Sequence, residues 1–418
     1  MRISSLQIFN TGVSNMQKGQ TALAKTQEQI STGKNLNRPS DDPVAAAQIL
    51  KYRRELAATE TYQENITVSQ RRLELEELTL QQINDASDRL KELAIQGNNS
   101  TLNNQNRAGI AEEAKQIQQF VLGLMNTKDA QGEYLFSGAK GDTQPFVADG
   151  QDGFSYAGDT EVRFIQTGPS ALIQSTDAGR DIFQVVPGDP SLKPLNAPAG
   201  LTVSVNEVGL LGDYLDDKGR TDLTLKLTSS GGYTLVDSAD LPVNDSNNNP
   251  ISGTAVAGAT VDLTDPLGIS FTMPSPLLDA PNTSVVPPVS AVTLRPEVPQ
   301  RSILTTAQDL IEALKTPITD QASREESGAK LARVMDEIGI SQDSLRQAVT
   351  QLGGRLVTLE NQSSVNQDYD IFTQTALLNL EDLDYASAIA KFSFQEVALQ
   401  AAQQTFARVN NLSLFNYL

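Results

Sequence analysis

The chain has 418 residues and contains no cysteine, no histidine and no tryptophan. The lack of cysteine excludes disulfides, thiol nucleophiles and thiolate metal sites, and the lack of histidine removes the commonest general base and metal ligand. We therefore expect a protein that is not an enzyme and that has no cofactor, no catalytic residue and no metal site. The missing cysteine fits either a cytosolic chain without redox chemistry or a chain that must pass an export channel without cross-links.

Basic residues are scarce relative to acidic ones. The chain has 32 Lys and Arg against 51 Asp and Glu, which gives a formal net charge of −19 at pH 7. Surfaces rich in phosphate repel such a chain, and the sequence has no run of 18 apolar residues that would span a membrane. The start turns polar at Ser4 and Ser5, before an apolar signal stretch develops. We therefore expect no nucleic-acid partner, no membrane partner and no secretory signal peptide.

Proline divides the chain. Of the 19 prolines, 14 lie between Pro187 and Pro299, where they would interrupt any helix. Short alternating runs such as Leu201–Val205 and Ile269–Met273 lie in the same region, between clusters of Gly, Pro, Asn and Asp. This pattern predicts a small, non-helical β domain over 171–300. The length of the chain predicts two to four domains.

Both flanks of this region carry apolar residues every seven positions, a pattern typical of helices that pack against helices. The pattern predicts a long helix from Pro43 to Gln96, with Asp42 as its N-terminal cap, and a second helix over 107–127 that forms an antiparallel hairpin with it. The stretch 132–168 predicts two or three strands. The predicted seam of the helical rod consists of Ile110, Ile117, Val121, Leu124, Leu331, Ile338, Leu345, Leu352 and Leu359.

Apolar residues also repeat every seven positions at the two extreme ends of the chain. Such a repeat is usually core of the same chain, but chain ends normally fray, and Gln20 and Gln27 occupy the interleaved positions of the first stripe. These ends gain most by packing against copies of themselves, which points to assembly. The predicted assembly residues are Leu6, Phe9, Met16, Leu23, Ile30, Tyr385, Phe392, Leu399 and Phe406.

Paired carboxylates are the remaining route to catalysis, because they can act as acid and base without histidine. Asp41–Asp42 and Glu76–Glu77 are adjacent pairs, but neighbours on a helix do not face each other. Asp245–Asn249 has oxygen ligands at alternate positions, but Pro250 stands where a calcium loop needs glycine. We interpret these groups as caps and solvated faces. The remote alternative is a secreted hydrolase that uses carboxylates of the β domain.

Four segments carry a family resemblance. They are Gln29–Val44 (QISTGKNLNRPSDDPV), Gly132–Gly138 (GEYLFSG), Leu383–Ile389 (LDYASAI) and the closing Asn411–Leu418. At these segments the chain resembles the bacterial flagellin family. Its opening and closing residues and the Gly132–Gly138 segment are more similar to the members that join hook and filament than to filament flagellin. The resemblance covers both ends of the chain and skips the β domain.

The resemblance implies a mainly α fold with a β insert. Long coiled-coil-type helices from both termini would form a flagellin-like rod, and the insert would be a small β-rich outer domain. The implied inner domain consists of residues 1–42 with 386–418, and the implied rod domain of 43–170 with 301–385. The insert, residues 171–300, would lie outermost.

The resemblance further implies a secreted structural protein of the bacterial flagellum that joins the hook to the filament. Its implied partners are another hook-associated protein, flagellin, further copies of the chain in a ring, and an export chaperone bound to the C-terminal helix. Arg89, Leu93 and Glu113 would form a surface for subunit packing or for an innate-immune receptor. The alternative is a minor flagellin, which would polymerise without limit.

Overall fold

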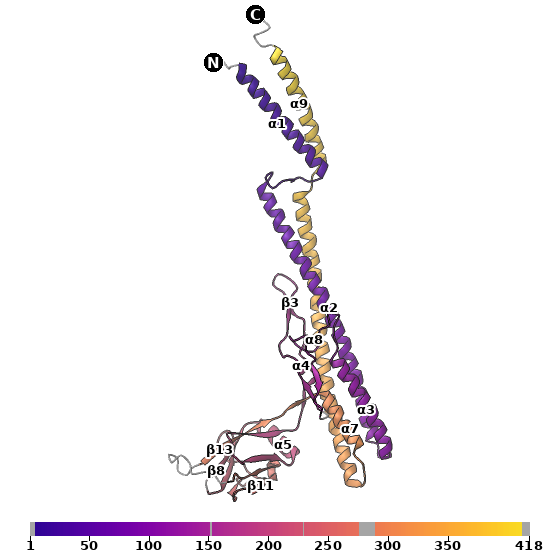
Figure 1. The fold of residues 1–418 in the computed structure, drawn as a ribbon, viewed down its shortest axis with the longest axis vertical. Helices are drawn as coiled ribbons and strands as arrows, with labels where there is room; N and C mark the ends of the chain where they lie inside the picture. Colours follow the sequence, from indigo (N-terminus) through magenta and orange to yellow (C-terminus); the bar gives the residue numbers. More distant parts are fainter. Residues whose placement is uncertain (1–4, 151–152, 229, 276–288, 412–418) are drawn as a thin grey trace. The chain divides into compact units, whose positions relative to one another are not determined.

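The computed structural model describes residues 5–150, 153–228, 230–275 and 289–411 (Figure 1). The opening residues 1–4 and the closing residues 412–418, which contribute to the family resemblance, lie outside the described residues. The chain forms two compact units. The first consists of Met1–Glu74, Phe164–Ser175 and Gly353–Leu418, and the second of Leu75–Arg163 and Thr176–Leu352.

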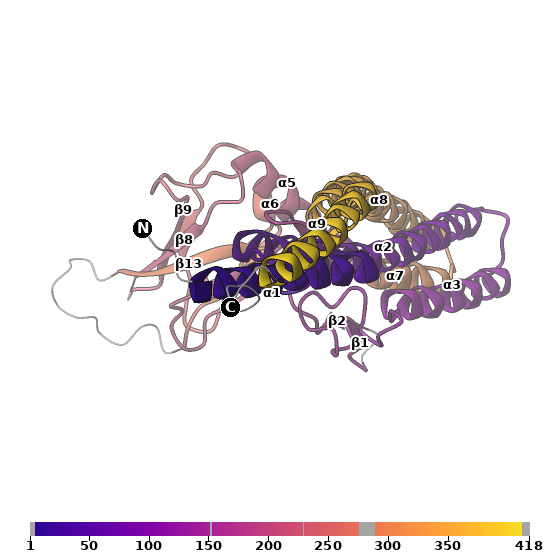
Figure 2. The ribbon, with the colours of Figure 1, turned by 90° about the horizontal axis from the view of Figure 1, so that it is seen from above.

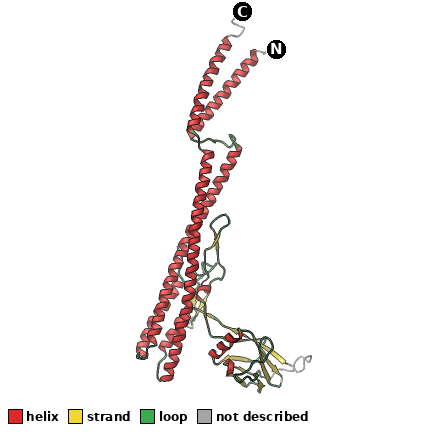
Figure 3. Cartoon of the chain, turned by 180° about the vertical axis from the view of Figure 1, so that it is seen from behind, coloured by secondary structure: helices red, strands yellow, loops and turns green. Residues whose placement is uncertain are grey.

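Long helices dominate the chain, as the apolar repeats predict (Figure 3). The cap predicted for α2 is confirmed, because Asp42 Oδ1 accepts hydrogen bonds from the backbone N–H groups of Val44 and Ala45, each at 3.0 Å. The terminal helices and the helical hairpin are α1 (Ser5–Thr32), α9 (Tyr385–Asn411), α2 (Pro43–Gly97) and α3 (Asn104–Met125).

α8 (Gln321–Glu381) is one continuous helix of 61 residues. It contains the whole heptad series from Leu331 to Leu359 and continues through the polar stretch 362–370. A second series of seven-residue spacing, from Ile371 to Phe406, is divided by the break between α8 and α9 at Asp382–Asp384. The second series therefore belongs to two different helices.

Two short antiparallel hairpins lie between α3 and α4. β1 (Phe146–Ala148) pairs with β2 (Phe154–Tyr156), and β3 (Phe164–Gln166) pairs with β4 (Leu172–Gln174). The side-chain amide of Asn366 on α8 donates to the carbonyl of Thr167 at 2.9 Å, which attaches the β3–β4 turn to the helices of the first unit. Strand β4 lies beyond residue 171, the first residue of the predicted insert domain.

The middle of the chain is rich in β structure, as predicted. One antiparallel sheet has the strand order β10–β9–β8–β13–β6, and a second has the order β11–β12–β7. Leu225, Leu227, Phe271 and Val292 belong to a buried cluster that is separate from the helical core of the second unit. The strands are β6 (Ser191–Leu195), β7 (Thr202–Val205), β8 (Leu223–Thr228), β9 (Gly232–Val236), β10 (Ser252–Thr254), β11 (Thr260–Leu263), β12 (Ile269–Thr272) and β13 (Val289–Glu297).

The structure also contains helices that the proline pattern does not predict. α5 (Val208–Lys218) lies inside the insert, so the prediction of a non-helical middle is wrong there. The sequence has no proline between Pro198 and Pro242, and Leu211 and Leu215, one turn apart, pack into the insert core. Two further helices, α4 (Gly179–Phe183) and α6 (Thr264–Leu267), lie within 171–300, whereas α7 (Ile303–Lys315) follows the proline-rich region, in the predicted rod.

The chain enters and leaves the insert at one point. β5 (Val186–Pro187) pairs with β14 (Gln300–Arg301). The N–H of Gly188 donates to the carbonyl of Pro299 at 2.7 Å. This two-stranded ribbon holds the two ends of the insert together, so the connection to the helices does not depend on the sheets.

We expect that the insert can be removed without unfolding the helices. Replacement of residues 190–298 by a short Gly-Ser linker keeps the ribbon and removes a separate core. The melting temperature should stay within about 4 °C of that of the full chain, which corresponds to about 1 kcal/mol. Thermal unfolding followed by the helical circular dichroism signal measures this. An unfolded or aggregated product would show that the insert contributes to the helical core.

Candidate functional site

The predicted assembly residues of the two termini face one another within one chain. α1 and α9 lie side by side (Figures 1 and 2). The ring centroids of Phe9 and Phe406 are 5.2 Å apart. A Cβ atom at Gly12 would lie 2.8 Å from the Phe406 ring, so this glycine permits the close approach of the helices. Leu6 lies in the first turn of α1, and the half-buried members of the two stripes are Met16, Leu23, Ile30, Phe392, Leu399 and Phe406.

A pair of helices cannot bury such stripes completely. Phe9 is 44% exposed and Tyr385 is 50% exposed. The opposite face of α9 is more open still, because Phe394 is 76% exposed and Val397 is 65% exposed. Phe394 lies two positions after Phe392, about 200° around the helix, so the two rings point to opposite sides. The terminal pair therefore leaves a second apolar face exposed.

The connections that lead from the terminal pair to α2 and α8 are bonded to each other. The N–H of Asn35 donates to the carbonyl of Glu381 at 2.7 Å, and the N–H of Leu383 donates to that of Gly33 at 3.0 Å. Lys25 Nζ lies 2.9 Å from Asp41 Oδ1, and this hydrogen bond lowers the pKa of the Asp41 carboxyl. The segment 29–44 thus connects α1 to α2 and is hydrogen-bonded to the connection between α8 and α9. Within it, Asp41 serves as an ion-pair partner of Lys25.

The predicted seam residues of the rod are largely buried. Gln342, a polar residue between the seam positions Ile338 and Leu345, is 4% exposed, and its side-chain amide donates to Asp88 Oδ1 at 2.7 Å. This bond supplies the partner that a buried amide needs. The buried seam residues are Ile110, Val121, Leu331, Ile338, Leu345, Leu352 and Leu359, and the half-buried ones are Ile117 and Leu124.

Arg89 and Glu113 form an exposed ion pair between α2 and α3. Arg89 Nη2 lies 2.6 Å from Glu113 Oε1, and Arg89 Nη1 lies 2.7 Å from Glu92 Oε2. The hydrogen bond to Glu92 raises the pKa of Arg89 most, and the hydrogen bond to Glu113 raises it further. Together with Phe120 the pair lines a groove of about 470 Å³. Leu93 is fully buried in the helical core, so it does not belong to the exposed surface of the single chain.

The carboxylates considered for catalysis or calcium binding either form hydrogen bonds within a turn or differ from each other in burial. Asp245 Oδ1 accepts from the N–H groups of Asn247 and Asn249 at 2.9 and 2.8 Å, which closes a tight turn. Glu76 is fully buried while Glu77 is half-buried, so the two do not share one environment. Among the described residues, no cluster of three or more acidic side chains is placed to hold a metal ion. In the same part of the chain, no helix has the length and apolar character needed to cross a membrane.

The sequence and the fold are similar to those of flagellar proteins. Residues 3–141 match the family described as the bacterial flagellin N-terminal helical region. Over 416 residues, the chain is 24% identical to flagellar hook-associated protein 3 of Escherichia coli K12, with 99% of both chains covered. The corresponding protein of Salmonella typhimurium LT2 is 23% identical over 416 residues, again with 99% of both chains covered.

The chain is thus similar to hook-associated protein 3 along its whole length, and its N-terminal third matches the flagellin family. The crystal structure of hook-associated protein-3 from Legionella pneumophila has the same fold, with a TM-score of 0.55 at 23% identity. The superposition covers 79% of this chain and 98% of that chain.

The flagellin-family match covers α1, α2 and α3 and continues to residue 141. It thereby includes the segment Gly132–Gly138, whose central Leu135 and Phe136 are fully buried. The Phe136 ring lies 5.0 Å from that of Phe183, in an edge-to-face arrangement. The segment therefore anchors the loop after α3 to the rest of the second unit.

Proposed function

We propose that the chain is a structural subunit of the bacterial flagellum that joins the hook to the filament and catalyses no reaction. The observation that carries the proposal is the similarity to hook-associated protein 3 along 99% of both chains, which includes the paired terminal helices and the insert. A minor flagellin is the second candidate. It has less support, because the relatives similar along the whole length are hook-associated proteins.

The mechanism is the packing of subunits through apolar faces that one chain leaves open. On α8, Val365, Tyr369 and Phe372 follow the spacing i, i+4, i+7 and are 59%, 43% and 68% exposed. Single exposed apolar residues are ordinary, but a stripe on successive turns of one helix favours a protein partner. The exposed face of α9, defined by Phe394 and Val397, supports the same role for the terminal pair.

The domain division belongs to the same proposal. Residues 1–42 with 386–418 form the inner terminal-helix domain, and 43–170 with 301–385 form the helical rod. Residues 171–300 form the outer β-rich domain, whose acidic surface keeps the assembled flagellum soluble. The separate core of the sheets supports an outer domain that takes no part in the helical packing.

The proposed partners are another hook-associated protein, flagellin and further copies of the chain in a ring. We place the protein outside the cell, exported through the flagellar apparatus with a chaperone on α9. The absence of cysteine suits a chain that must pass a channel without cross-links. Arg89 and Glu113 are candidates for subunit packing or for recognition by an immune receptor, and their exposure supports either role.

Immunogold labelling of isolated flagella tests the proposal. An antibody raised against the insert should label one site per flagellum, between hook and filament. The variant that lacks residues 190–298 is the matched control, because it should lose the label while the flagellum is retained. Labelling along the filament would favour the minor flagellin, and no labelling of flagella would contradict the proposal.

A further inference from the structure

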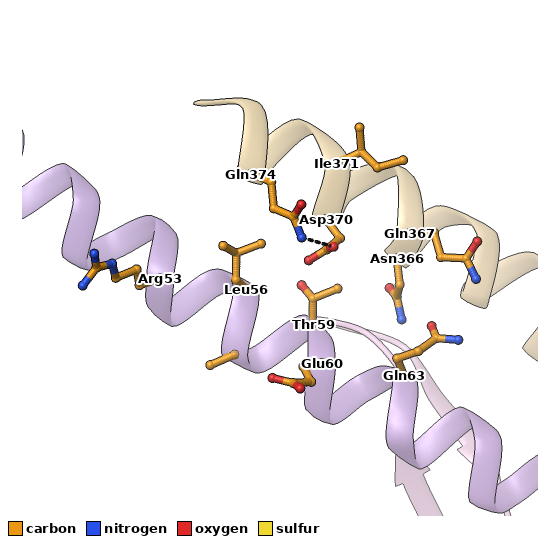
Figure 4. A pocket seen from close by; sticks show the side chains of 11 residues that line it. Arg53, Leu56, Thr59, Glu60, Gln63, Asn366, Gln367, Asp370, Ile371 and Gln374 are labelled. Atoms are coloured by element: carbon orange, nitrogen blue, oxygen red, sulfur yellow. Dashed lines mark hydrogen bonds between the residues drawn. The ribbon is translucent and has the colours of Figure 1, made fainter. Parts of the chain in front are cut away.

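A groove of about 700 Å³ lies between α2 and α8 in the first unit (Figure 4). Leu56, Ala57 and Ile371 give it apolar surface. Glu60 on α2 and Asp370 on α8 add a carboxylate from each helix. The groove thus combines an apolar part with two acidic groups and one cation, Arg53.

Neither carboxylate has a cationic partner within the described residues. Asp370 accepts a hydrogen bond from Gln374 Nε2 at 2.7 Å, on its own helix (Figure 4). No salt bridge involves Glu60 in the part of the chain that the structure describes. Arg53, which also lines the groove, is paired with Glu381. Such a groove suits a long cationic side chain. The aliphatic stem of that side chain can pack against the apolar surface, and its charged end can form hydrogen bonds with the carboxylates.

A cation of this kind lies on another face of the same helix. Arg54 is exposed and forms no ion pair within the described residues. It lies about 120° around α2 from Glu60 and about 9 Å from it along the helix axis, from 100° and 1.5 Å per residue. One chain therefore presents an acidic groove and a free cation on different faces, at nearly the same level.

We propose that the groove of one copy binds Arg54 of the next copy. The inference rests on the proposed function, which brings copies together in a ring. Each copy gives Arg54 to one neighbour and offers its groove to the other, so the contact joins two different faces. Contacts between different faces form rings or open helices, and a ring results where the rotation closes, whereas a twofold dimer needs one face that meets itself.

Cross-linking tests the geometry directly, because the chain has no cysteine of its own. The double variant Arg54→Cys/Glu60→Cys, incorporated into flagella and treated with a short bismaleimide, should give a ladder of dimers, trimers and larger species. A contact between identical faces would stop at the dimer and overturn the proposal. A cross-link between the two cysteines of one chain leaves a monomer, so it does not produce a ladder of larger species.

Arg71→Cys/Glu60→Cys is the matched control. Arg71 is an exposed arginine of α2 without an ion pair in the described residues. It lies about 26 Å along the axis from Arg54, too far to reach the same groove. This variant should give no ladder. An equal ladder from both pairs would show that cross-linking reports crowding, and it would overturn the proposal.

Charge exchange provides an independent readout. Arg54→Glu should reduce the amount of the protein in isolated flagella by about tenfold or more, since it places like charges together. Adding Asp370→Arg to this variant should restore incorporation, while Arg54→Lys should change little. Equal losses for Arg54→Glu with and without Asp370→Arg would contradict the pairing.

The identity of the occupant is tested with the single variant Glu60→Cys, labelled with a benzophenone maleimide and irradiated in flagella. An adduct of two copies is the expected product. An adduct with flagellin or with another hook-associated protein would overturn the choice of a second copy. Protein present at the junction without ladder or charge effect would overturn this inference alone, whereas absence of the unmodified protein from the junction would overturn the proposed function.

Discussion

Phe394→Glu is expected to abolish incorporation into the flagellum and swimming, while the purified chain unfolds at an unchanged temperature. Phe394 is 76% exposed, so a carboxylate at this position stays hydrated in the free chain. In a packed interface the phenyl ring contributes about 1.5–3 kcal/mol, and an unpaired carboxylate costs more than the lost contact. Swimming in soft agar, immunogold counts and thermal unfolding measure the three quantities.

Two variants on the same helix serve as controls. Phe394→Leu keeps an apolar side chain and should retain swimming, whereas Gln400→Glu adds the same charge at an exposed polar position and should also be tolerated. Phe392→Glu and Phe406→Glu should loosen the α1–α9 pair and prevent incorporation, but leave the unfolding of α2, α3 and α8 nearly unchanged. Normal swimming of Phe394→Glu would show that this face stays in water in the flagellum.

Leu345→Glu should destabilise the isolated chain by about 3–5 kcal/mol, because it removes a core side chain and buries an unpaired charge. Leu345 is 1% exposed on α8, within the predicted rod seam. Its partners are therefore in the same chain, and the loss should appear without any assembly. Urea unfolding followed by circular dichroism measures the free energy of unfolding.

Ile340→Glu is the matched control for this prediction. Ile340 lies five residues earlier on α8 and is 41% exposed, so the same substitution should change the free energy of unfolding by about 0.5 kcal/mol or less. A similar loss for both variants would show that helix propensity or net charge, and not burial, determines the effect. Equal stability of Leu345→Glu and the unmodified chain would show that the seam is not core.

The long helices were predictable because their signals are local and repeated. The heptads of α8 and the pair Asp42–Pro43 each depend on residues a few positions apart, and the structure contains both the helix and the cap. α5 escapes such reasoning for a different reason. Proline was counted over the whole region from Pro187 to Pro299, whereas a helix needs only a short stretch without it, such as Val208–Lys218.

Contacts between distant segments could not be predicted from the same signals. β6 lies beside β13 although about 100 residues separate them, and no pattern in either strand specifies the other. The exposed face of α9 was missed because the heptad selects one stripe, and Phe394 lies outside it. The signal that would find it is an aromatic residue on the side of the helix opposite the stripe. Leu93 entered through the family resemblance alone, which carries no information about its burial.

The pairing of α1 with α9 has a consequence for the timing of assembly. Phe9 and Phe406 meet although they lie near opposite ends of the chain. A polypeptide that leaves a channel with one end first cannot complete this pair until its other end has also emerged. The helices of the middle form from local contacts and need not wait. If the chain is exported as proposed, the subunit acquires its terminal packing surface only when delivery of the whole chain is finished, and a partly delivered chain lacks that surface.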